Sequence, residues 1–461
     1  MTNRLKIRLH GTHVADLEQA PRSGNLTIQY AKSWLDNDLA YALSMQMPLQ
    51  ERAFGDTVAV PFVAGLLPDS KIHRRMIGQT LGLGDPSEFG LLEAIGRECA
   101  GAVSVVPEDE DDAPELSVTP EFEVLSEAEL ADLIRSLPRR PLMINEDGHI
   151  RLSLAGVNDK AALIRVGGRL ARPLGNTPST HILKTDTPNL VDSAKTENFC
   201  LKLAREMGIK APRSYIEQAE DQVYLLVNRY DRKLVAHQSG LKLQRIHQED
   251  FCSALGFSPN FKYENQGGPG WKVCFTLLNT ASTDKGFIRH RSALPHPRSS
   301  DRLALLNLTM FQWLIGNPDA HAKNYSLLLG PHGVSLAPAY DLNNSAAFRD
   351  FFKEVRPRMA MSISGEFHPD RLTGAHWDDF ALQAGFPPAV VRQALKDTSA
   401  RLPDIAATLA NSIRGSIEWS DRIDLIVTDI AQRCSSVPDM LAERSLNNTK
   451  IADGDIEPIL P

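Results

Sequence analysis

The sequence predicts an α+β chain with a strand-rich amino-terminal half and a helical carboxy-terminal half. Short segments in which apolar and polar residues alternate gather before about residue 245, whereas spacings typical of amphipathic helices dominate after it. The 461 residues are 42% hydrophobic and 23% charged, which is typical of a globular chain and argues against a fibrous or wholly disordered one. At about 150 residues per domain, this length allows roughly three structural units.

The amino-terminal region is predicted to combine strands with a capped helix. Residues 5–10 (LKIRLH) alternate like a half-buried strand, and Ser70 stands where an N-cap would start a short amphipathic helix at 71–77. A second strand is predicted at 101–106. It runs into residues 107–114, where five consecutive carboxylates lie between two prolines. Because like charges repel and prolines block strand pairing, we interpret this acidic segment as a solvated linker between domains.

The region after Ile150 is predicted to form a small sheet followed by helices. The predicted sheet segments are an alternating strand at 150–154, a turn at 156–160 leading into a hairpin at 161–168, and strands at 180–184 and 223–227. Helical spacing is found at 196–208, 303–314 and 421–433, and Gly208 is placed to end the first of these helices. Residues 445–461 are polar and lack periodicity, which predicts a frayed tail.

Composition narrows the class of protein. A formal net charge of −7 argues against bulk nucleic-acid binding as the main activity. The five cysteines are scattered without a CxxC pair, which argues against a disulfide framework or a thiolate zinc site. No apolar run approaches the roughly 18 residues of a membrane span, and charged residues stand where a signal peptide would be apolar. We therefore expect a cytoplasmic chain without a membrane partner.

One segment carries a candidate catalytic motif, although GxxxxGK[ST], HExxH and GxSxG are absent. Asp319 and Asn324 are five positions apart, as in the D-x-x-x-x-N of a protein-kinase catalytic loop. There the Asp orients the attacking hydroxyl, and the Asn holds magnesium beside the transferred phosphate. Because about one such pair is expected by chance in a chain of this length, Asp319 taken alone is better explained as a turn residue after Pro318.

The order of further residues strengthens the kinase interpretation. Lys184 ends an apolar strand as a phosphate-pairing lysine does, and Glu197 opens the next helix, where it could pair with that lysine. Asp341 follows a strand downstream of the loop, where a kinase places its magnesium-binding aspartate. Each has a simple structural alternative, namely a solvated strand end, a favourable helix-start charge and an Asx turn. The four features in this order favour phosphoryl transfer from ATP.

A glycine-rich phosphate loop is not evident. Residues 153–160 (SLAGVNDK) contain one glycine rather than G-x-G-x-x-G, and their spacing alone predicts a plain hairpin turn. Only their position before the lysine strand suggests a cover for phosphates that uses backbone N–H donors.

With these motifs the chain resembles a HipA-type serine/threonine kinase toxin, the kinase component of a bacterial type II toxin–antitoxin pair, over about residues 1–435. The resemblance is carried by segments 66–70 (LLPDS), 95–103 (IGRECAGAV), 153–160, 180–184 (THILK), 228–232 (NRYDR), 248–250 (QED), 262–264 (KYE), 267–270 (GGPG), 311–316 (FQWLIG), 319–324 (DAHAKN) and 340–341 (YD). So many segments in one order are more specific than any single motif.

The resemblance implies a two-lobed, protein-kinase-like fold with a strand-rich amino-terminal lobe and an all-helical carboxy-terminal lobe. The expected domains are a HipA-type amino-terminal subdomain (1–107), an acidic linker with a connecting helix (108–148), the small-lobe core (149–235), a helical lobe with the catalytic loop (236–440) and a flexible tail (441–461). We expect the subdomain before Pro107 to supply partner contacts beyond the ATP site.

The resemblance also implies residue roles, with ATP and Mg²⁺ as cofactors. The expected assignments are Asp319 as catalytic base; Asn324 and Asp341 as magnesium ligands; Lys184 at the ATP phosphates with Glu197 as its partner; Asn228, Arg229 and Tyr230 as the adenine hinge, read through backbone groups; Tyr340 at the nucleotide; His321 and Lys323 around the phosphates; Ala155, Gly156, Val157, Asn158, Asp159 and Lys160 as the phosphate lid; and Ser153 as the autophosphorylated serine. Phosphate on Ser153 would place nearly two negative charges where the ATP phosphates lie.

Three departures from the family pattern stand out. The lid has Asn158 and Asp159 where relatives often carry Gln and Glu, and Asn228 replaces a common glutamate at the hinge. Residues 285–298 look longer and more basic than in the archetype; a solvated loop is the simpler interpretation, and a contact surface for RNA, DNA or an acidic protein is the sharper one.

The implied function is inhibition of translation by phosphorylating an aminoacyl-tRNA synthetase, glutamyl-tRNA synthetase in the archetype. A helix-turn-helix antitoxin (HipB-like) is the implied partner, and operator DNA would be bound within that complex. Two alternatives remain open at this point. One is a small-molecule kinase of related fold, which has no reason to carry the amino-terminal segments, and the other is a catalytically silent regulator that binds only its partner and DNA.

Overall fold

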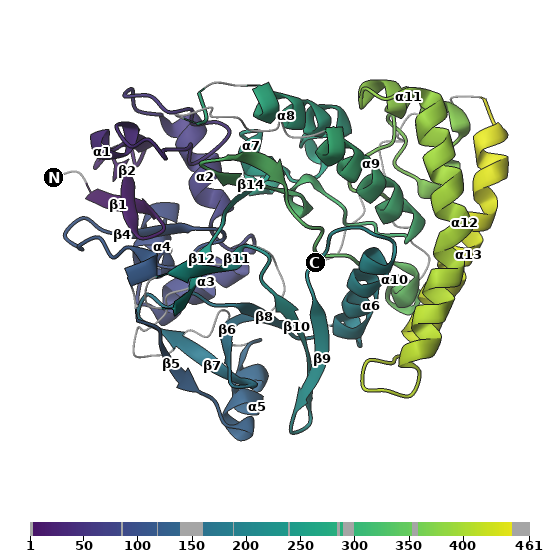
Figure 1. Ribbon diagram of the computed structural model, residues 1–461, viewed down its shortest axis with the longest axis horizontal. Helices are drawn as coiled ribbons and strands as arrows, with labels where there is room; N and C mark the ends of the chain where they lie inside the picture. The colour runs from purple at the N-terminus through teal and green to yellow at the C-terminus, as the bar shows by residue number, and fades with distance from the viewer. Residues whose placement is uncertain are drawn as a thin grey trace.

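A computed structural model places two lobes side by side with an amino-terminal subdomain packed beside both (Figure 1). The structure describes residues 3–83, 86–117, 119–138, 160–187, 189–237, 240–283, 286–288, 299–352 and 358–444. Several predictions therefore lie outside the described residues: the strand at 150–154, Ser153, the lid residues 155–159, the basic segment 285–298 apart from 286–288, and the tail from 445.

The amino-terminal subdomain (residues 3–107) is a four-stranded antiparallel sheet covered by helices. The strand order is β3-β2-β1-β4. The strands are β1 (Asn3–Leu9), β2 (Thr12–Gln19), β3 (Leu26–Tyr30) and β4 (Val103–Pro107), and the helices are α1 (Lys32–Leu35), α2 (Asp56–Gly65), α3 (Lys71–Thr80) and α4 (Glu88–Ile95). The predicted strands at 5–10 and 101–106 are confirmed as β1 and β4. The predicted cap is also confirmed, because the Ser70 hydroxyl accepts a hydrogen bond from the His73 N–H at 3.2 Å.

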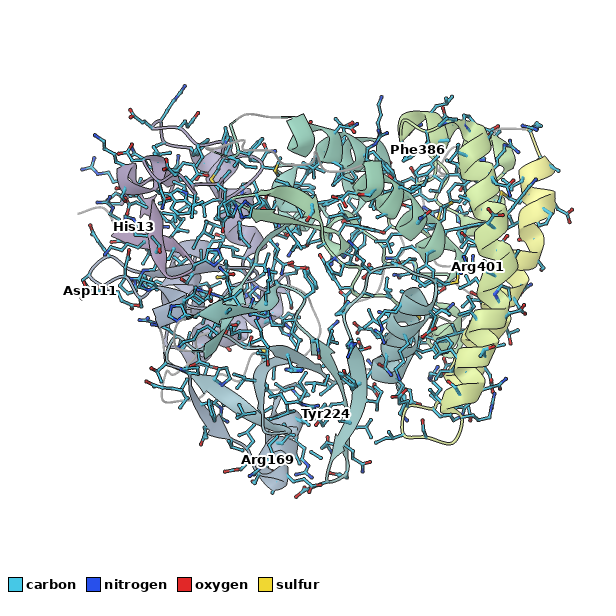
Figure 2. The ribbon with its side chains drawn as sticks, in the orientation of Figure 1. His13, Asp111, Arg169, Tyr224, Phe386 and Arg401 are labelled. Carbon is cyan, nitrogen blue, oxygen red and sulfur yellow. The ribbon has the colours of Figure 1, made fainter. Side chains whose placement is uncertain are left out.

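The acidic segment after β4 is not simply solvated. Glu110 accepts hydrogen bonds from Arg8 of β1 at 3.1 Å, and it pairs with Arg97 at 2.6 Å. The Arg8 side chain is only 3% exposed, so this ion pair is partly buried. The segment still lies at the outer edge of the molecule, where Figure 2 labels Asp111. Its mutually repelling carboxylates are held in place partly by Arg97 nearby and partly by Arg4 and Arg8, which lie about a hundred residues away in sequence and could not be found from a local pattern.

Beyond the acidic segment, Glu115 ties the chain to β12 (Gly240–Arg245). The buried carboxylate of Glu115, at the start of the 3₁₀ turn η1 (Glu115–Ser117), accepts from the Arg245 side chain at 2.6 Å and from its backbone N–H at 3.0 Å. Burial alone would raise the pKa of Glu115, but Arg245 and His10 together outweigh it and lower the pKa to about 2.

A depressed folded-state pKa makes stability dependent on pH. The contribution of Glu115, about 3 kcal/mol, is fully present above its unfolded pKa near 4.5 and is lost as pH falls towards 2. We expect Glu115→Gln to lower the unfolding free energy at pH 7 and to flatten its decline between pH 5 and 3, as measured by urea denaturation. The control Glu108→Gln, on a side chain 58% exposed, should follow the native curve. Parallel curves for native protein and Glu115→Gln would contradict this assignment.

The small lobe is built on a six-stranded sheet with the order β5-β7-β6-β8-β10-β9. Its strands are β5 (Glu121–Val124), β6 (Lys160–Val166), β7 (Arg169–Leu174), β8 (His181–Lys184), β9 (Ser214–Ala219) and β10 (Gln222–Asn228), with helices α5 (Glu127–Ser136) and α6 (Ser193–Glu206). The hairpin predicted at 161–168 is found as β6 and β7, which are joined by Gly167 and Gly168 at positive φ. The predicted helix at 196–208 is α6.

Within the expected acidic linker with its connecting helix, β5 joins this sheet as an edge strand and α5 is a helix that packs on it. Val124 of β5 pairs with Ala171 of β7, and α5 packs on the sheet behind a Ser126–Glu129 capping box. Alternation along the strands then separates the two faces of the sheet. Leu183 and Leu226 point towards α5, so their neighbours on the opposite face point away from it. Lys160 and Lys184, which are direct cross-strand partners, therefore share the opposite face.

A buried ionic network joins the subdomain to the small lobe. Glu98, just after α4, accepts hydrogen bonds from Arg232 at 2.8 Å, from Arg229 at 3.3 Å and from the Ser179 hydroxyl at 2.7 Å. Arg229 also forms a two-pronged contact with Asp231 at 2.7 and 3.0 Å. Because these charges are buried and each has an oppositely charged partner, the interface is held in one arrangement.

The large lobe is mainly helical, as predicted. Its helices are α7 (Phe251–Ala254), α8 (Trp271–Thr283), α9 (Ser299–Leu314), α10 (Arg349–Phe352), α11 (Gly374–Gln383), α12 (Pro388–Ile413) and α13 (Arg422–Ala442), and its 3₁₀ turns are η3 (Pro259–Phe261), η4 (Glu264–Gln266), η5 (Ala322–Asn324), η6 (Ala346–Phe348) and η7 (Pro369–Arg371). The predicted helices at 303–314 and 421–433 are α9 and α13. Within the described part of the chain, no helix combines the length and apolarity needed to cross a membrane.

The carboxy-terminal half is, however, not all-helical. A hairpin of β11 (Arg232–His237) and β12 leads into a three-stranded sheet of β13 (His247–Asp250), β14 (Ser326–Gly330) and β15 (Gly333–Leu336). β13 reads His-Gln-Glu-Asp and has no apolar alternation, so its strand conformation depends on pairing with β14, far along the chain. This sheet matters for the site because β14 begins just after η5.

Candidate functional site

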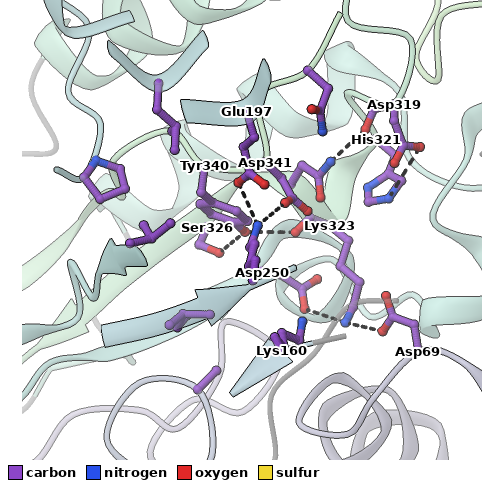
Figure 3. A pocket seen from close by; sticks show the side chains of 18 of the residues that line it. Asp69, Lys160, Glu197, Asp250, Asp319, His321, Lys323, Ser326, Tyr340 and Asp341 are labelled. Carbon is purple, nitrogen blue, oxygen red and sulfur yellow. Dashed lines mark hydrogen bonds and ion pairs between the residues drawn. The ribbon is translucent and has the colours of Figure 1, made fainter. Parts of the chain in front are cut away.

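One cavity collects the candidate residues from both lobes and from the subdomain (Figure 3). Every predicted site residue within the described part of the chain lines it: Lys160, Lys184, Glu197, Asn228, Arg229, Tyr230, Asp319, His321, Lys323, Asn324, Tyr340 and Asp341. The amino-terminal subdomain contributes further residues to the lining of this cavity, namely Phe62, Gly65, Leu66 and Asp69. The lid residues 155–159 and Ser153 lie outside the described residues.

At the centre of the cavity, Lys184 bridges two carboxylates. Its Nζ lies 2.7 Å from Glu197 Oε1 and 2.7 Å from Asp341 Oδ1. Glu197 reaches the lysine because α6 packs on the same face of the sheet, and its side chain is almost completely buried. Burial opposes protonation of Lys184, but the two carboxylates outweigh it and raise the pKa of the lysine above its usual value. The lysine is therefore a fixed cation.

Asp341 is held in a conformation that few residues adopt. Its φ is 56°, in the left-handed region that a non-glycine residue enters at an energetic cost. Burial would raise the pKa of its carboxyl, but the Lys184 ammonium holds that pKa well below its usual range. The result is an ionised carboxylate aimed at the lysine. Strained backbone of this kind is often found at ligand sites.

The loop formed by residues 319–324 is fixed by hydrogen bonds from several directions. The Asp319 N–H donates to Asn317 Oδ1 at 3.1 Å, and the Asp319 carbonyl accepts from Asn324 Nδ2 at 2.7 Å. The side chain of Asp319 accepts a hydrogen bond from the Tyr263 hydroxyl at 2.8 Å on Oδ1. His321 lies beside it, with Nε2 at 3.9 Å from the same oxygen. One carboxylate oxygen is thus engaged by Tyr263, and Oδ2 is the atom suited to a second donor.

His321 is an uncharged neighbour of the loop aspartate. Its side chain is 4% exposed, and burial lowers its pKa, so the neutral imidazole is favoured. Its ring packs edge-to-face on Tyr263, with centroids 5.1 Å apart. Its Nδ1 is buried without a hydrogen-bond partner among the described residues, so a polar group of a ligand in the cavity would satisfy it.

The charge lining the cavity bears on what could bind there. Among the described residues, seven carboxylates (Asp69, Glu197, Asp231, Glu249, Asp250, Asp319 and Asp341) face five cations (Lys160, Lys184, Arg229, Lys262 and Lys323). A polyphosphate would therefore meet no surplus of positive charge and would need a divalent cation with it. Burial and the neighbouring Lys184 also lower the pKa of Lys160 to about 8, so this lysine loses its positive charge as the pH rises above that value.

Two oxygen donors are placed for such a cation. Asn324 uses its amide nitrogen for the loop, which leaves Oδ1 as the atom able to contact a metal, and Asp341 supplies a carboxylate. The described residues hold no cluster of three or more His, Cys, Asp or Glu side chains that would form a complete protein cage. Magnesium does not need one, because it is commonly held by one or two protein oxygens together with substrate phosphates and water. The residues present fit Mg²⁺ bound with a nucleotide.

The predicted hinge combines structural and available groups. The N–H groups of Asn228 and Arg229 already donate to the carbonyls of Arg213 and Thr180, each at 2.9 Å. The Arg229 guanidinium is committed to the network with Glu98 and Asp231. Asn228 Oδ1, in contrast, is buried beside the ring of His181, its cross-strand neighbour, and an amide oxygen can accept from a further donor. An amino group on a bound base would satisfy this acceptor, so the segment fits adenine better through the Asn228 side chain than through these two N–H groups.

Two site residues carried no assigned role in the sequence analysis. Tyr263 lies in the KYE segment and contacts Asp319, and Asp69 lies in the LLPDS segment and contacts Lys323 at 2.6 Å. Both segments were recognised, but only as marks of resemblance. The contacts join residues that are 56 and 254 positions apart, so spacing gave no signal for either.

Family models match most of the chain. The HipA N-terminal domain matches residues 5–106, and the HipA-like C-terminal domain matches residues 152–406. A protein of Sinorhizobium fredii named "Putative kinase Y4mE" is 33% identical over 421 residues, which cover 90% of this chain and 94% of that protein.

A second relative connects sequence and structure. The "Serine/threonine-protein kinase toxin HipA" of Shewanella oneidensis is 28% identical over 403 residues, covering 87% of this chain and 88% of that protein. A solved complex of HipA, HipB and operator DNA from Shewanella oneidensis contains a chain that matches the present fold with a TM-score of 0.76 and 26% identity, over 95% of this chain and 99% of that one. The match extends over the subdomain and both lobes.

Proposed function

The chain belongs to the HipA family, and from this we propose that it is an ATP-dependent serine/threonine protein kinase that serves as the toxin of a toxin–antitoxin pair. One observation carries the proposal: Lys184 lies 2.7 Å from both Glu197 and Asp341, in the cavity that Asp319 and Asn324 also line. A lysine–glutamate pair, a loop aspartate, an asparagine five residues later and a further aspartate are the groups that protein kinases use.

The residues divide the work of phosphoryl transfer. Lys184 would hold the phosphates of ATP, and Asn324 and Asp341 would hold Mg²⁺, which neutralises charge on the transferring phosphoryl group. Asp319 Oδ2 would accept the proton of the attacking serine or threonine hydroxyl while the hydroxyl oxygen of the substrate bonds to the γ-phosphorus. The bond between the γ-phosphorus and the β–γ bridging oxygen breaks, and ADP leaves with the electron pair.

A second group of cavity-lining residues suits adenine. Tyr230 and Tyr340 stack with ring centroids 5.7 Å apart at the cavity wall, and Asn228 Oδ1 offers a buried acceptor for the adenine amino group. Tyr340 is fixed in turn, because its hydroxyl donates to the Lys323 carbonyl at 2.9 Å. These contacts support a nucleotide over a small anion as the ligand.

Tyr263 is expected to orient the base. Replacing Tyr263 with phenylalanine removes the hydrogen bond to Asp319 Oδ1, which is worth roughly 1.5 kcal/mol to a charged acceptor, and frees the carboxylate to rotate. We expect kcat to fall about tenfold, while the KM for ATP changes less than twofold. Steady-state phosphorylation assays would measure both constants. A parallel rise in KM would indicate instead that Tyr263 shapes the nucleotide pocket.

The finer substrate assignment follows the resemblance. We propose a serine of an aminoacyl-tRNA synthetase as the protein substrate, with glutamyl-tRNA synthetase the first candidate, and Ser153 as a self-phosphorylation site that switches the kinase off. In both cases phosphate would add nearly two negative charges to a nucleotide-binding loop, where it opposes binding of further phosphates.

We also propose a HipB-like antitoxin partner, through which the acidic chain reaches operator DNA. The support is the Shewanella oneidensis complex of HipA, HipB and operator DNA, whose HipA chain is matched along almost all of its length. The net charge of −7 suits an arrangement in which the antitoxin supplies most of the contacts to bases and phosphates.

The proposal is tested by following phosphate incorporation. Native chain and Asp341→Ala would each be incubated with γ-labelled ATP and Mg²⁺, with and without candidate synthetases and with a chelator as control. We expect labelling of Ser153 and of one synthetase by the native chain only, with the sites identified by mass spectrometry. A native chain that binds its antitoxin and operator but incorporates no phosphate would favour the silent regulator, and labelling of small molecules alone would favour the other alternative.

A further inference from the structure

We propose that Asp69 of the amino-terminal subdomain is a positioning residue for the catalytic loop and acts through Lys323. The inference deepens the proposed function and rests on it. Asp69 Oδ1 lies 2.6 Å from Lys323 Nζ, and the two side chains are 10% and 4% exposed. Their contact is therefore a buried ion pair between the first hundred residues and the loop that carries Asp319 and Asn324.

The Asp69 carboxylate is presented from a fixed support. It lies between α2 and α3, two residues after Leu67, which is fully buried. Arg74 of α3 donates to the carbonyl of Pro68 at 2.6 Å and to that of Ala64 at 3.2 Å, so one guanidinium ties the turn before Asp69 to the end of α2. Figure 3 shows Asp69 pointing at Lys323.

The receiving end is equally constrained. The Lys323 carbonyl accepts from the Tyr340 hydroxyl, and its Nζ lies 2.6 Å from Asp69 but 4.0 Å from Asp250. Burial would raise the pKa of Asp69, but Lys323 and then Lys262 lower it, so the carboxyl stays ionised. Asp69 is thus the closer anion that fixes the lysine of η5. Asn324, the next residue, takes its place from the same turn.

Because Asp69 is negatively charged, its removal should affect kcat and nucleotide affinity differently, and this difference distinguishes a positioning role from a general structural one. Removing the Asp69 charge leaves the cavity less negative, so a nucleotide polyanion should bind no more weakly than before. The loop, however, loses the ion pair between Asp69 and Lys323 that fixes its position. Misplacement of catalytic groups by about 1 Å can lower the rate roughly a hundredfold. Loss of kcat without loss of nucleotide affinity is therefore the signature of a positioning residue.

The test compares native chain with Asp69→Asn, Asp69→Glu, Lys323→Met and the double variant Asp69→Asn/Lys323→Met. We expect Asp69→Asn to lower kcat about ten- to a hundredfold with the KM for ATP unchanged or lower, and Asp69→Glu to recover most of the rate. If Asp69 acts through Lys323, the double variant should be no slower than Lys323→Met alone. The matched control is Asp16→Asn, which breaks a 2.6 Å pair with Arg4 in the same subdomain, away from the cavity.

A second measurement does not depend on activity. Amide hydrogen exchange over residues 319–325 should accelerate in Asp69→Asn and stay native in Asp16→Asn. Unchanged exchange in Asp69→Asn, or multiplicative rate losses in the double variant, would overturn the inference even if the kinase proposal stands. Conversely, a native chain without phosphoryl transfer would overturn the proposed function, while the exchange data would still decide whether Asp69 holds the loop.

Discussion

Replacing Asp319 with asparagine is expected to reduce phosphoryl transfer about a thousandfold while ATP still binds. The substitution keeps the shape of the side chain and its acceptor for the Tyr263 hydroxyl at Oδ1, so the loop should keep its conformation. What it removes is the oxygen able to take a proton, and general-base catalysis contributes roughly 10²–10⁴-fold. The rate is measured by steady-state phosphorylation, and ATP binding by calorimetry.

A surface aspartate of the same lobe provides the control. Asp424 is 52% exposed and pairs with Arg414 on the outside of the molecule, so Asp424→Asn should keep native kcat within about twofold. If Asp319→Asn kept more than a tenth of the native rate, Asp319 would not be the base, and the hydroxyl would have to lose its proton to another group.

The second large effect is expected at Lys184. Replacing it with methionine leaves Glu197 buried without its cation, and breaking one half of a buried ion pair costs about 3 kcal/mol or more. It also removes the cation nearest to both acidic partners, and loss of one such electrostatic contact typically lowers a rate about 10²–10³-fold. We therefore expect Lys184→Met to lose stability and activity together.

The two effects can be separated by a second substitution. In Lys184→Met/Glu197→Gln the unpaired carboxylate becomes a neutral amide, so the unfolding free energy should partly recover while phosphoryl transfer stays low. Lys202→Met, also on α6 but paired with Glu418 outside the cavity, should change stability by no more than about 1 kcal/mol. A double variant that regains activity would show that Lys184 acts only on stability.

Local sequence patterns predicted the helices, strands and loop that carry the site. The order of the motif residues predicted that their side chains would lie together in one site. The strand ending at Lys184, the helix bearing Glu197 and the loop from Asp319 all follow from spacing within fewer than fifteen residues. The cavity then brings Asp341 to within 2.7 Å of Lys184, although 157 positions separate them. The order of the motif residues and the family resemblance together supplied the expectation for this long-range contact, because periodicity alone cannot encode it.

What escaped prediction depends on partners far apart in the chain. The acidic segment looked solvated because the arginines that neutralise it, such as Arg8, lie in another strand. The strand β13 was missed because His-Gln-Glu-Asp becomes a strand only beside β14. Asp69 and Tyr263 were visible as residues but not as contacts. In each case tertiary pairing, rather than local preference, decides the conformation.

The subdomain touches both lobes through charged contacts. Glu98 forms ion pairs with Arg229 of the small lobe and with Arg232 of β11, while Asp69 forms an ion pair with Lys323 of the large lobe. A rotation of the lobes that opens the cleft would stretch one of these ion pairs. The amino-terminal subdomain therefore constrains the angle between the lobes, in addition to the segment that connects them. Under the proposed kinase function, nucleotide exchange would therefore depend on the position of the first hundred residues, and a macromolecule bound to them would alter the rate without entering the cleft.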